Sequence, residues 1–220
     1  MLKENLIEIP IEKGNLVGNL YLSEEGSGLV VFAHGSGSGR MSPRNRYVAE
    51  ILQQGGLSTL LIDLLTIEEE KEDEETSRLR FDIPLLARRL IQITDWLLKQ
   101  PKIKSHQIGY FGASTGAAAA LMAAAERPQK IHAVVSRGGR PDLAKPKLFL
   151  VKAPTLLIVG GDDRAVIGMN EEALDQLSCI KRMVIIPGAT HLFEEPGTLA
   201  QVAQLARDWF QNHLKFQKGA

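Results

Sequence analysis

The sequence of 220 residues has little cysteine and no excess of charge of either sign. Cys179 is the only cysteine, which excludes an internal disulfide and leaves no cysteine cluster for zinc. The 26 lysines and arginines balance the 26 aspartates and glutamates, so no overall field attracts nucleic acid or an anionic membrane. We therefore expect no nucleic-acid partner and no metal or other cofactor, and any preference for charge has to be local.

Long hydrophobic runs are also missing. The segment from Met1 to Pro10 mixes charged and apolar residues, which predicts neither a signal peptide nor a transmembrane helix. We therefore expect a cytoplasmic protein, a monomer or small homo-oligomer, without a membrane partner. With 44% hydrophobic residues and no evident linker or repeat, residues 1–220 are expected to form a single domain.

Short apolar runs alternate with amphipathic segments along most of the chain. Residues 5–12 and 16–22, separated by Lys13-Gly14-Asn15, predict an antiparallel hairpin. Buried strands are expected at 29–33, 57–62, 107–111, 131–135, 155–159 and 182–186, and helices at 43–54, 81–99, 117–126, 171–177 and 199–213. This alternation predicts an α/β fold in which helices cover both faces of a mostly parallel sheet. The acidic run 68–75 is interpreted as a solvated loop or frayed helix start rather than a partner-binding segment.

Polar residues follow several of these strands at their carboxyl ends, where ligand sites of parallel sheets lie. They are His34, Asp63, Ser114, Arg137, Asp163 and His191. The sequence thereby selects one edge of the sheet as the candidate site.

Ser114 stands in the turn between a predicted strand and an alanine-rich helix. Gly112 and Gly116 flank it at two positions each way, as expected where a tight turn leaves no room for a Cβ. This Gly-x-Ser-x-Gly pattern is typical of a nucleophile elbow. The alternative is a serine that caps the helix in a glycine-flanked turn, and the strand before and helix after it favour the nucleophile.

A serine nucleophile needs an imidazole to accept its proton and a carboxylate to orient that imidazole. The chain order Ser114, Asp163, His191 matches the order of nucleophile, acid and base in hydrolases of this architecture. Asp162 competes with its neighbour as the acid, although it is better suited to capping the turn. Asp63 is a weaker candidate and is interpreted as a loop-capping residue.

An oxyanion hole needs two aimed N–H groups. Thr115 follows the nucleophile and is expected to supply one, and Ser36 in the glycine-rich loop is expected to supply the other. His34 is interpreted as a brace for this loop. The loop lacks the Gly-Lys-Ser/Thr ending of a nucleotide-binding loop and the spacing of a dinucleotide fingerprint, which argues against nucleotide binding.

Several arginines fall in loops expected at the same edge. They are Arg40, Arg78, Arg80, Arg137, Arg140 and Arg164. Guanidinium groups near one site would hold an anionic substrate group, with Arg137 and Arg140 as the pair to test. The alternative is a set of separate surface ion pairs with the acidic run.

Four motifs together resemble one enzyme family across nearly the whole chain. They are Gly112-Ala113-Ser114-Thr115-Gly116, His34-Gly35-Ser36, Gly160-Gly161-Asp162-Asp163-x-x-Val166 and Gly188-Ala189-Thr190-His191-Leu192-Phe193. The chain is similar to α/β-hydrolases of the dienelactone hydrolase-like branch. The resemblance implies an eight-stranded core without a large inserted cap and a triad of Ser114, Asp163 and His191. Similar domains occur attached to phosphoribosyltransferases, yet no phosphoribosyl-pyrophosphate loop is evident here.

One departure from the family bears on the substrate. Dienelactone hydrolases proper use a cysteine nucleophile, whereas this chain has Ser114 and its only cysteine lies far away. Dienelactone is therefore disfavoured, and the sequence predicts a carboxylesterase-like serine hydrolase of small carboxylic esters. Short acyl chains are expected because only the acidic stretch 68–80 could form a lid. A thioesterase or peptidase with the same triad, or a noncatalytic module that binds an anionic ligand, is the alternative.

Overall fold

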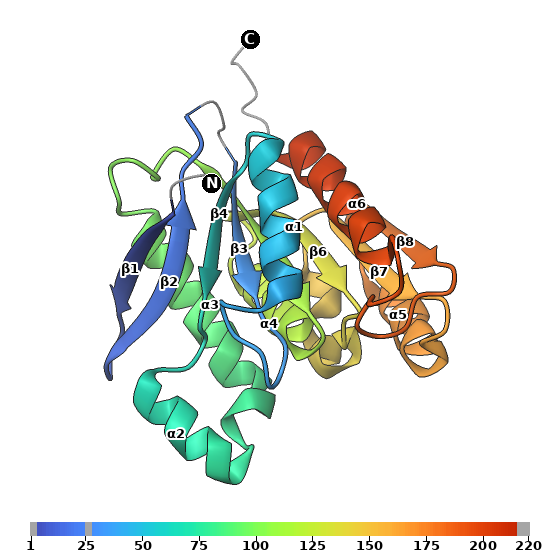
Figure 1. Cartoon of the computed structure of the whole chain (residues 1–220), viewed down its shortest axis with the longest axis horizontal. Helices are drawn as coiled ribbons and strands as arrows, with labels where there is room; N and C mark the ends of the chain where they lie inside the picture. Colours follow the sequence, from blue (N-terminus) through green and yellow to red (C-terminus); the bar gives the residue numbers. More distant parts are fainter. Residues whose placement is uncertain (1–3, 25–27, 215–220) are drawn as a thin grey trace.

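The computed structural model describes residues 4–24 and 28–214. The predicted domain of residues 1–220 also includes residues 1–3, 25–27 and 215–220, which lie outside the described part. The strands are β1 (Asn5–Pro10), β2 (Asn15–Tyr21), β3 (Gly28–Ala33), β4 (Ser58–Ile62), β5 (Gln107–Ala113), β6 (Ile131–Arg137), β7 (Thr155–Gly160) and β8 (Lys181–Ile186). They form one sheet in the order β1-β2-β4-β3-β5-β6-β7-β8 (Figure 1).

The sheet is antiparallel at its N-terminal edge and parallel elsewhere. The predicted hairpin pairs β1 with β2, and β2 then pairs antiparallel with β4. The remaining neighbours are parallel. All residues of β3, β4 and β7 are buried, as their unbroken apolar runs predict for strands covered on both faces. The predicted fold class is thus confirmed.

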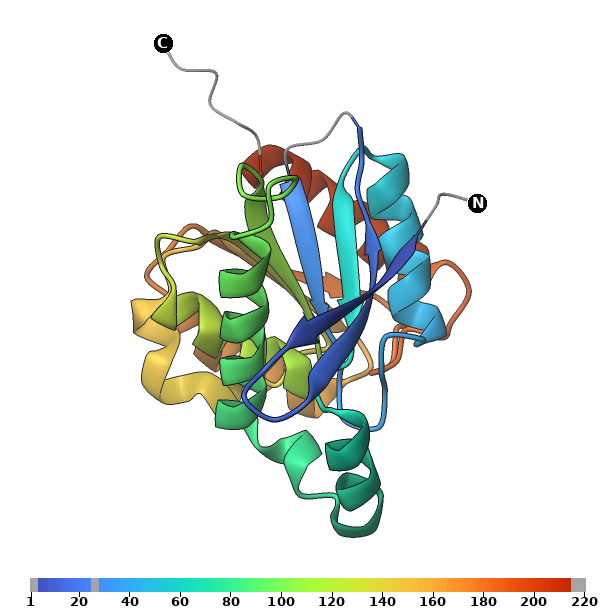
Figure 2. The same ribbon diagram turned by 90° about the vertical axis from the view of Figure 1, so that its left-hand side faces the viewer.

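Helices cover both faces of the sheet. They are α1 (Pro43–Gln54), α2 (Ile67–Thr76), α3 (Ile83–Leu97), α4 (Thr115–Glu126), α5 (Arg164–Gln176) and α6 (Thr198–His213), with 3-10 turns η1 (Leu79–Phe81) and η2 (Pro141–Leu150). α1 and α6 lie on one face, and α3, α4 and α5 on the other, which Figure 2 shows from the side. Each face has its own apolar core.

The acidic run forms a helix rather than the expected loop or frayed start. Thr66 accepts the Glu69 N–H, and the Glu69 carboxylate accepts the Thr66 N–H, so a capping box begins α2. Asp73 is buried and accepts the backbone N–H groups of Leu79 and Arg80. The composition of the run, acidic residues with one lysine, does not indicate these contacts, because Thr66, Leu79 and Arg80 all lie outside the run.

Two other segments differ from the sequence expectation. α5 begins at Arg164, seven residues before the predicted start at Glu171, because buried Asn170 donates to the carbonyls of Gly139 and Val166 and ties the first turns down. The 3-10 segment η2 has no apolar periodicity to predict it. In the part of the chain that the structure describes, none of the helices is both long and apolar enough to cross a membrane.

Candidate active site

Ser114 is the single residue between β5 and α4. Its backbone has φ 50° and ψ −120°, a conformation that L-residues rarely adopt. A Cβ on Gly116 would lie 2.2 Å from the Ala33 carbonyl oxygen, and one on Gly112 would lie 2.4 Å from the Cα of Ala117. The serine side chain makes no helix-capping bond. The turn therefore has the strained, tightly packed form of a nucleophile elbow, and the capping alternative does not describe it.

The Ser114 hydroxyl begins a chain of hydrogen bonds. His191 Nε2 lies 3.3 Å from Ser114 Oγ, and His191 Nδ1 lies 2.7 Å from Asp163 Oδ2. Because a carboxylate only accepts at this pair, the proton of the neutral imidazole stays on Nδ1 and leaves Nε2 able to accept from the serine. The structure brings the three residues together from the ends of β5, β7 and β8.

Asp163, rather than Asp162, bonds to the imidazole. Asp163 occupies the N-cap position of α5 but makes no side-chain capping bond, so its carboxylate is available to His191. The Asp162 N–H donates to the Ala189 carbonyl and joins the two loops. A Cβ on Gly160 would lie 2.4 Å from that same carbonyl oxygen, which explains the glycine before the acid.

The loop that carries His191 is fixed from both sides. Glu195 accepts the backbone N–H and the hydroxyl of Thr190. Phe193 is buried at 1% exposure with φ 57°, and Gly138 at the end of β6 packs against the His191 carbonyl. These contacts hold the imidazole above the serine.

The two predicted oxyanion-hole residues lie beside each other. Thr115 is the first residue of α4, so its N–H has no acceptor within the helix. The Ser36 N–H donates to Thr115 Oγ1 at 3.0 Å. The Thr115 N–H is thus directed by the helix, whereas the Ser36 N–H is bonded to the Thr115 hydroxyl in this structure.

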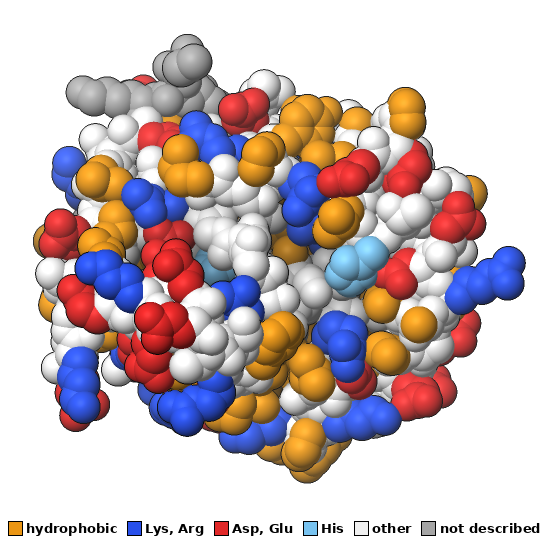
Figure 3. Space-filling view, turned by 60° about the horizontal axis from the view of Figure 1, so that its bottom comes forward, with side chains coloured by type: hydrophobic (Ala, Val, Ile, Leu, Met, Phe, Trp, Pro, Cys, Tyr) orange, Lys and Arg blue, Asp and Glu red, His pale blue; other side chains and the backbone are white. Residues whose placement is uncertain are grey.

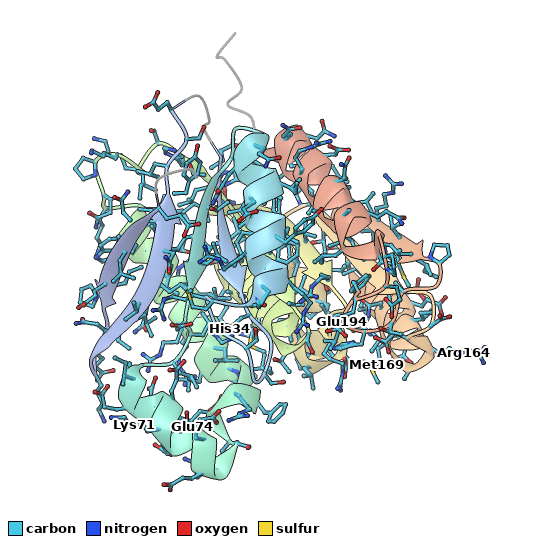
Figure 4. The ribbon with its side chains drawn as sticks, in the orientation of Figure 1. His34, Lys71, Glu74, Arg164, Met169 and Glu194 are labelled. Atoms are coloured by element: carbon cyan, nitrogen blue, oxygen red, sulfur yellow. The ribbon has the colours of Figure 1, made fainter. Side chains whose placement is uncertain are left out.

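His34 and Asp63 make the contacts expected of loop supports. His34 Nδ1 lies 3.0 Å from the Gly35 carbonyl, and Nε2 accepts the Leu64 N–H at 3.1 Å. Burial lowers the pKa of His34 and keeps its ring neutral, as the accepting nitrogen requires. Asp63 accepts the backbone N–H of Arg40 at 2.6 Å and pairs with its guanidinium. Both side chains hold the glycine-rich loop (Figure 4 labels His34).

A cavity of about 200 Å³ opens beside Ser114. Its lining comes from Gly35, Ser36, Ser38, Arg44, Ala113, Ser114, Arg137, His191 and Leu192. Arg140 is absent from this lining and makes two hydrogen bonds to Asp142 instead. Arg44 takes its place, although it lies in the first turn of α1 and follows no strand, so the sequence offered no signal for it.

Two of the other loop arginines form ion pairs with the acidic run, as the alternative expects, whereas Arg40 and Arg140 pair with aspartates outside it. Arg78 pairs with Glu72, and Arg80 pairs with Asp73, both in α2. The side chain of Arg164 extends away from the molecule (Figure 4). Only Arg137 among the six predicted arginines lines the cavity beside the serine.

A second cavity of about 360 Å³ lies across the glycine-rich loop and shares Gly35, Ser36 and Ser38 with the first. Glu70 and Glu74 of α2 contribute to its wall. Figure 3 shows acidic side chains gathered on this side of the face. Burial, and then the charge of Asp63, raise the pKa of Glu70. The acidic stretch therefore lines this second cavity and contributes no residue to the lining of the cavity beside Ser114.

Within residues 4–24 and 28–214, no group of three or more His, Cys, Asp or Glu side chains is arranged to hold a metal ion.

Comparison with known proteins identifies several similar sequences and folds. The profile described as "Dienelactone hydrolase family" matches residues 27–219. The crystal structure of a dienelactone hydrolase from Anabaena variabilis is 62% identical, with a TM-score of 0.96 over 97% of this chain and 99% of that chain. A lidless α/β serine hydrolase from Xanthomonas campestris shares the fold at 18% identity, with a TM-score of 0.77 over 96% and 95% of the two chains.

Curated relatives from Mycobacterium tuberculosis carry another name. The protein named "Putative phosphoribosyl transferase" is 54% identical over 213 residues, which are 97% of this chain and 47% of that protein. The chain thus spans about half the length of the curated relatives it matches.

Proposed function

The chain belongs to the dienelactone hydrolase family of α/β-hydrolases, and on that premise we propose that it is a serine hydrolase that cleaves small carboxylic esters. The observation that supports this most is the continuous chain of hydrogen bonds from Ser114 through His191 to Asp163. The strained backbone at Ser114 supports it further, because strain at one side chain is typical of a group aimed at a substrate.

In this proposal Ser114 Oγ attacks the acyl carbon while His191 Nε2 takes its proton. The carbonyl oxygen becomes an oxyanion, which accepts from the Thr115 N–H. The Ser36 N–H turns from the Thr115 hydroxyl to the oxyanion, since a charged acceptor forms the stronger bond. His191 then gives the proton to the leaving alcohol as the carbonyl re-forms, which leaves an acyl-enzyme.

The second half of the reaction repeats these roles with water. His191 accepts a proton from water, the resulting hydroxide attacks the acyl carbon, and the proton returns to Ser114 as the acid leaves. Asp163 stays ionised throughout and stabilises the imidazolium. The cavity of about 200 Å³ beside the serine supports the choice of a short acyl group in this proposal.

Replacement of the nucleophile tests the proposal directly. Ser114→Ala is expected to lower turnover of p-nitrophenyl acetate by roughly 10⁴- to 10⁶-fold and to abolish labelling by a fluorophosphonate. Ser178→Ala is the matched control, since that hydroxyl is exposed and bonds only to the Phe149 carbonyl. Labelling that persists in Ser114→Ala, with a native circular dichroism spectrum, would refute the role of this serine.

The choice of acid can be tested by a pair of adjacent substitutions. Asp163→Asn is expected to lower kcat by about 10⁴-fold, because the amide no longer fixes the tautomer of His191. Asp162→Asn is expected to leave kcat within about threefold, since only the backbone of that residue joins the two loops. Equal losses in the two variants would contradict the assignment.

The name of the longer relatives suggests phosphoribosyl transfer for those proteins as wholes. We propose that this activity, where present, resides in the half of those proteins that this chain does not match. This chain, which matches the other half, carries Ser114 and His191, and its glycine-rich loop bonds to Asp63 and Thr115 rather than presenting a phosphate-binding motif. Assay of this chain with phosphoribosyl pyrophosphate and nucleobases is expected to give no transfer.

A further inference from the structure

Asn170 is a fully buried amide in α5, next to Met169, which Figure 4 labels. Its Nδ2 donates to the Gly139 carbonyl at 3.0 Å and to the Val166 carbonyl at 2.8 Å. Both partners are acceptors, so the amide is held with its NH2 group toward them, and a flipped amide would set its own oxygen against two carbonyl oxygens. The bond to Gly139 joins α5 to the loop between β6 and η2.

Anchoring of the helix does not explain why this residue is polar. Among the described residues, the buried Oδ1 of Asn170 has no hydrogen-bond partner, and a buried acceptor without a donor lowers stability. An apolar side chain would anchor α5 without an unpaired oxygen, as Val166 and Ala173 do on the same face of the helix. What an apolar side chain cannot make is the bond to the Gly139 carbonyl.

At one end of this bond is the first turn of α5, which sets the position of Asp163. The Asp163 carbonyl accepts the N–H groups of Val166 and Ile167 at 3.0 Å, and the Asp163 N–H donates to the Gly160 carbonyl at 3.1 Å. The Asp163 side chain makes no capping bond, so the carboxylate has no tie to its own helix. Its direction toward His191 therefore depends on where this turn lies.

At the other end is the loop between β6 and η2, which contacts the other two residues of the triad. The Arg137 carbonyl accepts the Ser114 N–H at 3.2 Å, and the Arg140 N–H donates to the Ser114 carbonyl at 3.1 Å. A Cβ on Gly138 would lie 3.0 Å from the His191 carbonyl oxygen. A displacement of this loop would therefore reach both the nucleophile and the base.

The loop has two adjacent glycines and needs support from outside. Gly138 has φ 50°, in the region that favours glycine, and a Cβ on Gly139 would overlap with Ser136 Oγ. Glycines leave the backbone with its greatest conformational freedom. The Gly138 N–H donates to the Ile158 carbonyl, and the Gly139 carbonyl accepts from Asn170. One side chain of α5 thus holds the second of the two glycines.

We infer that Asn170 is a positioning residue for the proposed hydrolysis. Its amide joins the turn that carries Asp163 to the loop that contacts the other two triad residues, and it thereby keeps the Asp163 carboxylate aligned with His191. The inference rests on the proposed esterase function, and Asn170 itself touches no reacting atom. The bond from Asp163 to His191 is 2.7 Å long, and a misplacement of about 1 Å in a catalytic site can cost about 100-fold in rate.

Asn170→Leu removes the amide and keeps a side chain of similar size. We expect it to lower kcat for p-nitrophenyl acetate by about 10- to 100-fold and to change KM by less than about threefold. The reason for the split is that no residue of α5 lines the cavity beside Ser114. An unchanged kcat, or an equal effect confined to KM, would overturn the inference.

Lys181→Met is the matched control, because it loosens the other end of the same helix. Lys181 Nζ donates to the carbonyls of Leu174 and Leu177. The control should lower Tm but leave kcat within about threefold of the wild type. A loss of kcat equal to that of Asn170→Leu would show that any loosening of α5 has this effect, and the specific role of Asn170 would fall.

A double-mutant cycle tests whether Asn170 acts through Asp163. In the background of Asp163→Asn, Asn170→Leu should lower the remaining kcat by less than about threefold, because the carboxylate that it positions is already gone. A role limited to holding the helix, or one exerted on Ser114 alone, would give the same loss in both backgrounds. That result would contradict the inference.

A proton NMR signal separates the inference from the proposed function. The Nδ1 proton of His191 in its bond to Asp163 should resonate far downfield, and its loss in Asp163→Asn assigns it. Asn170→Leu should lose this signal or shift it upfield, and Lys181→Met should keep it. This response in a protein without ester turnover or fluorophosphonate labelling would refute the esterase and leave the positioning role standing. Ester turnover with an unchanged signal and kcat in Asn170→Leu would do the reverse.

Asn170→Thr decides the matter if Asn170→Leu does not fold. A threonine hydroxyl in a helix bonds to the carbonyl four residues earlier, here that of Val166. It is shorter than the amide and is directed back along the helix, so the bond to Gly139 is lost while the bond within α5 is kept. The variant should show the same loss of kcat and the same change of the NMR signal. Wild-type behaviour of Asn170→Thr would overturn the inference.

Discussion

Replacement of Ser114 by glycine is expected to stabilise the protein while removing its proposed nucleophile. The serine has φ 50° and ψ −120°, a conformation that glycine adopts without a steric cost. The surrounding structure imposes it, because the Ser114 carbonyl accepts the N–H groups of Ala117 and Arg140. Ser114→Ala is the reference, since it also lacks the hydroxyl but keeps the Cβ that causes the strain.

The size of the effect follows from two opposing terms. Relief of a strained backbone is worth about 1–3 kcal/mol. The greater freedom of glycine in the unfolded chain costs about 0.4–1 kcal/mol. Ser114→Gly should therefore be more stable than Ser114→Ala by about 1 kcal/mol, whereas an alanine-to-glycine change at an unstrained position costs about the same amount.

Thermal unfolding of the two variants measures this difference. For a chain of this length, about 1 kcal/mol corresponds to a rise in Tm of roughly 2–4 °C. Chemical denaturation should give the same sign with an unchanged m-value. A glycine variant that melts below the alanine variant would show that the turn stores no strain, and the argument that this backbone is held against its preference would fail.

Two further substitutions test supports of the site. Burial lowers the pKa of His34, so between pH 6.5 and the folded-state pKa the unfolded chain binds a proton that the native state does not. The free energy of unfolding therefore decreases as the pH is lowered through this range. His34→Gln should show a smaller loss of Tm than the wild type between about pH 7.5 and about pH 5.5. Equal losses would contradict this. Gly116→Ala should destabilise the protein by about 1–3 kcal/mol or more, because the added Cβ would lie 2.2 Å from the Ala33 carbonyl oxygen. Gly168→Ala is the control: a Cβ there meets nothing within 4 Å, and the variant should be more stable than the wild type by about 0.5–1 kcal/mol.

Local pattern was enough to predict most of the fold. The apolar run Leu29–Ala33 has no alternation, so it had to be covered on both faces, and β3 lies buried at the centre of the sheet. Gly112 and Gly116 predicted a tight turn because only a missing Cβ permits such an approach. The placement of Ser114, Asp163 and His191 at one edge followed from the direction of parallel strands.

Partners distant in the sequence were beyond the reach of local pattern. The sequence favoured a solvated loop or a frayed helix start at 68–75 because the residues that anchor α2, such as Arg80 and Arg89, lie outside the run. It also selected Arg140 for substrate binding and did not select Arg44. Position after a strand was the only guide. It does not reveal that Asp142 pairs with Arg140, or that helix α1 places Arg44 in the lining of the cavity beside Ser114.

Hydrophobic spacing and the absence of a Cβ at two glycines were enough to predict the order of the eight strands, most of the helices and the three residues expected at the serine site. Tertiary structure alone decided which charges remain without a partner. Whether a buried guanidinium such as Arg137 is neutralised depends on side chains from other elements, and no local pattern records their distances.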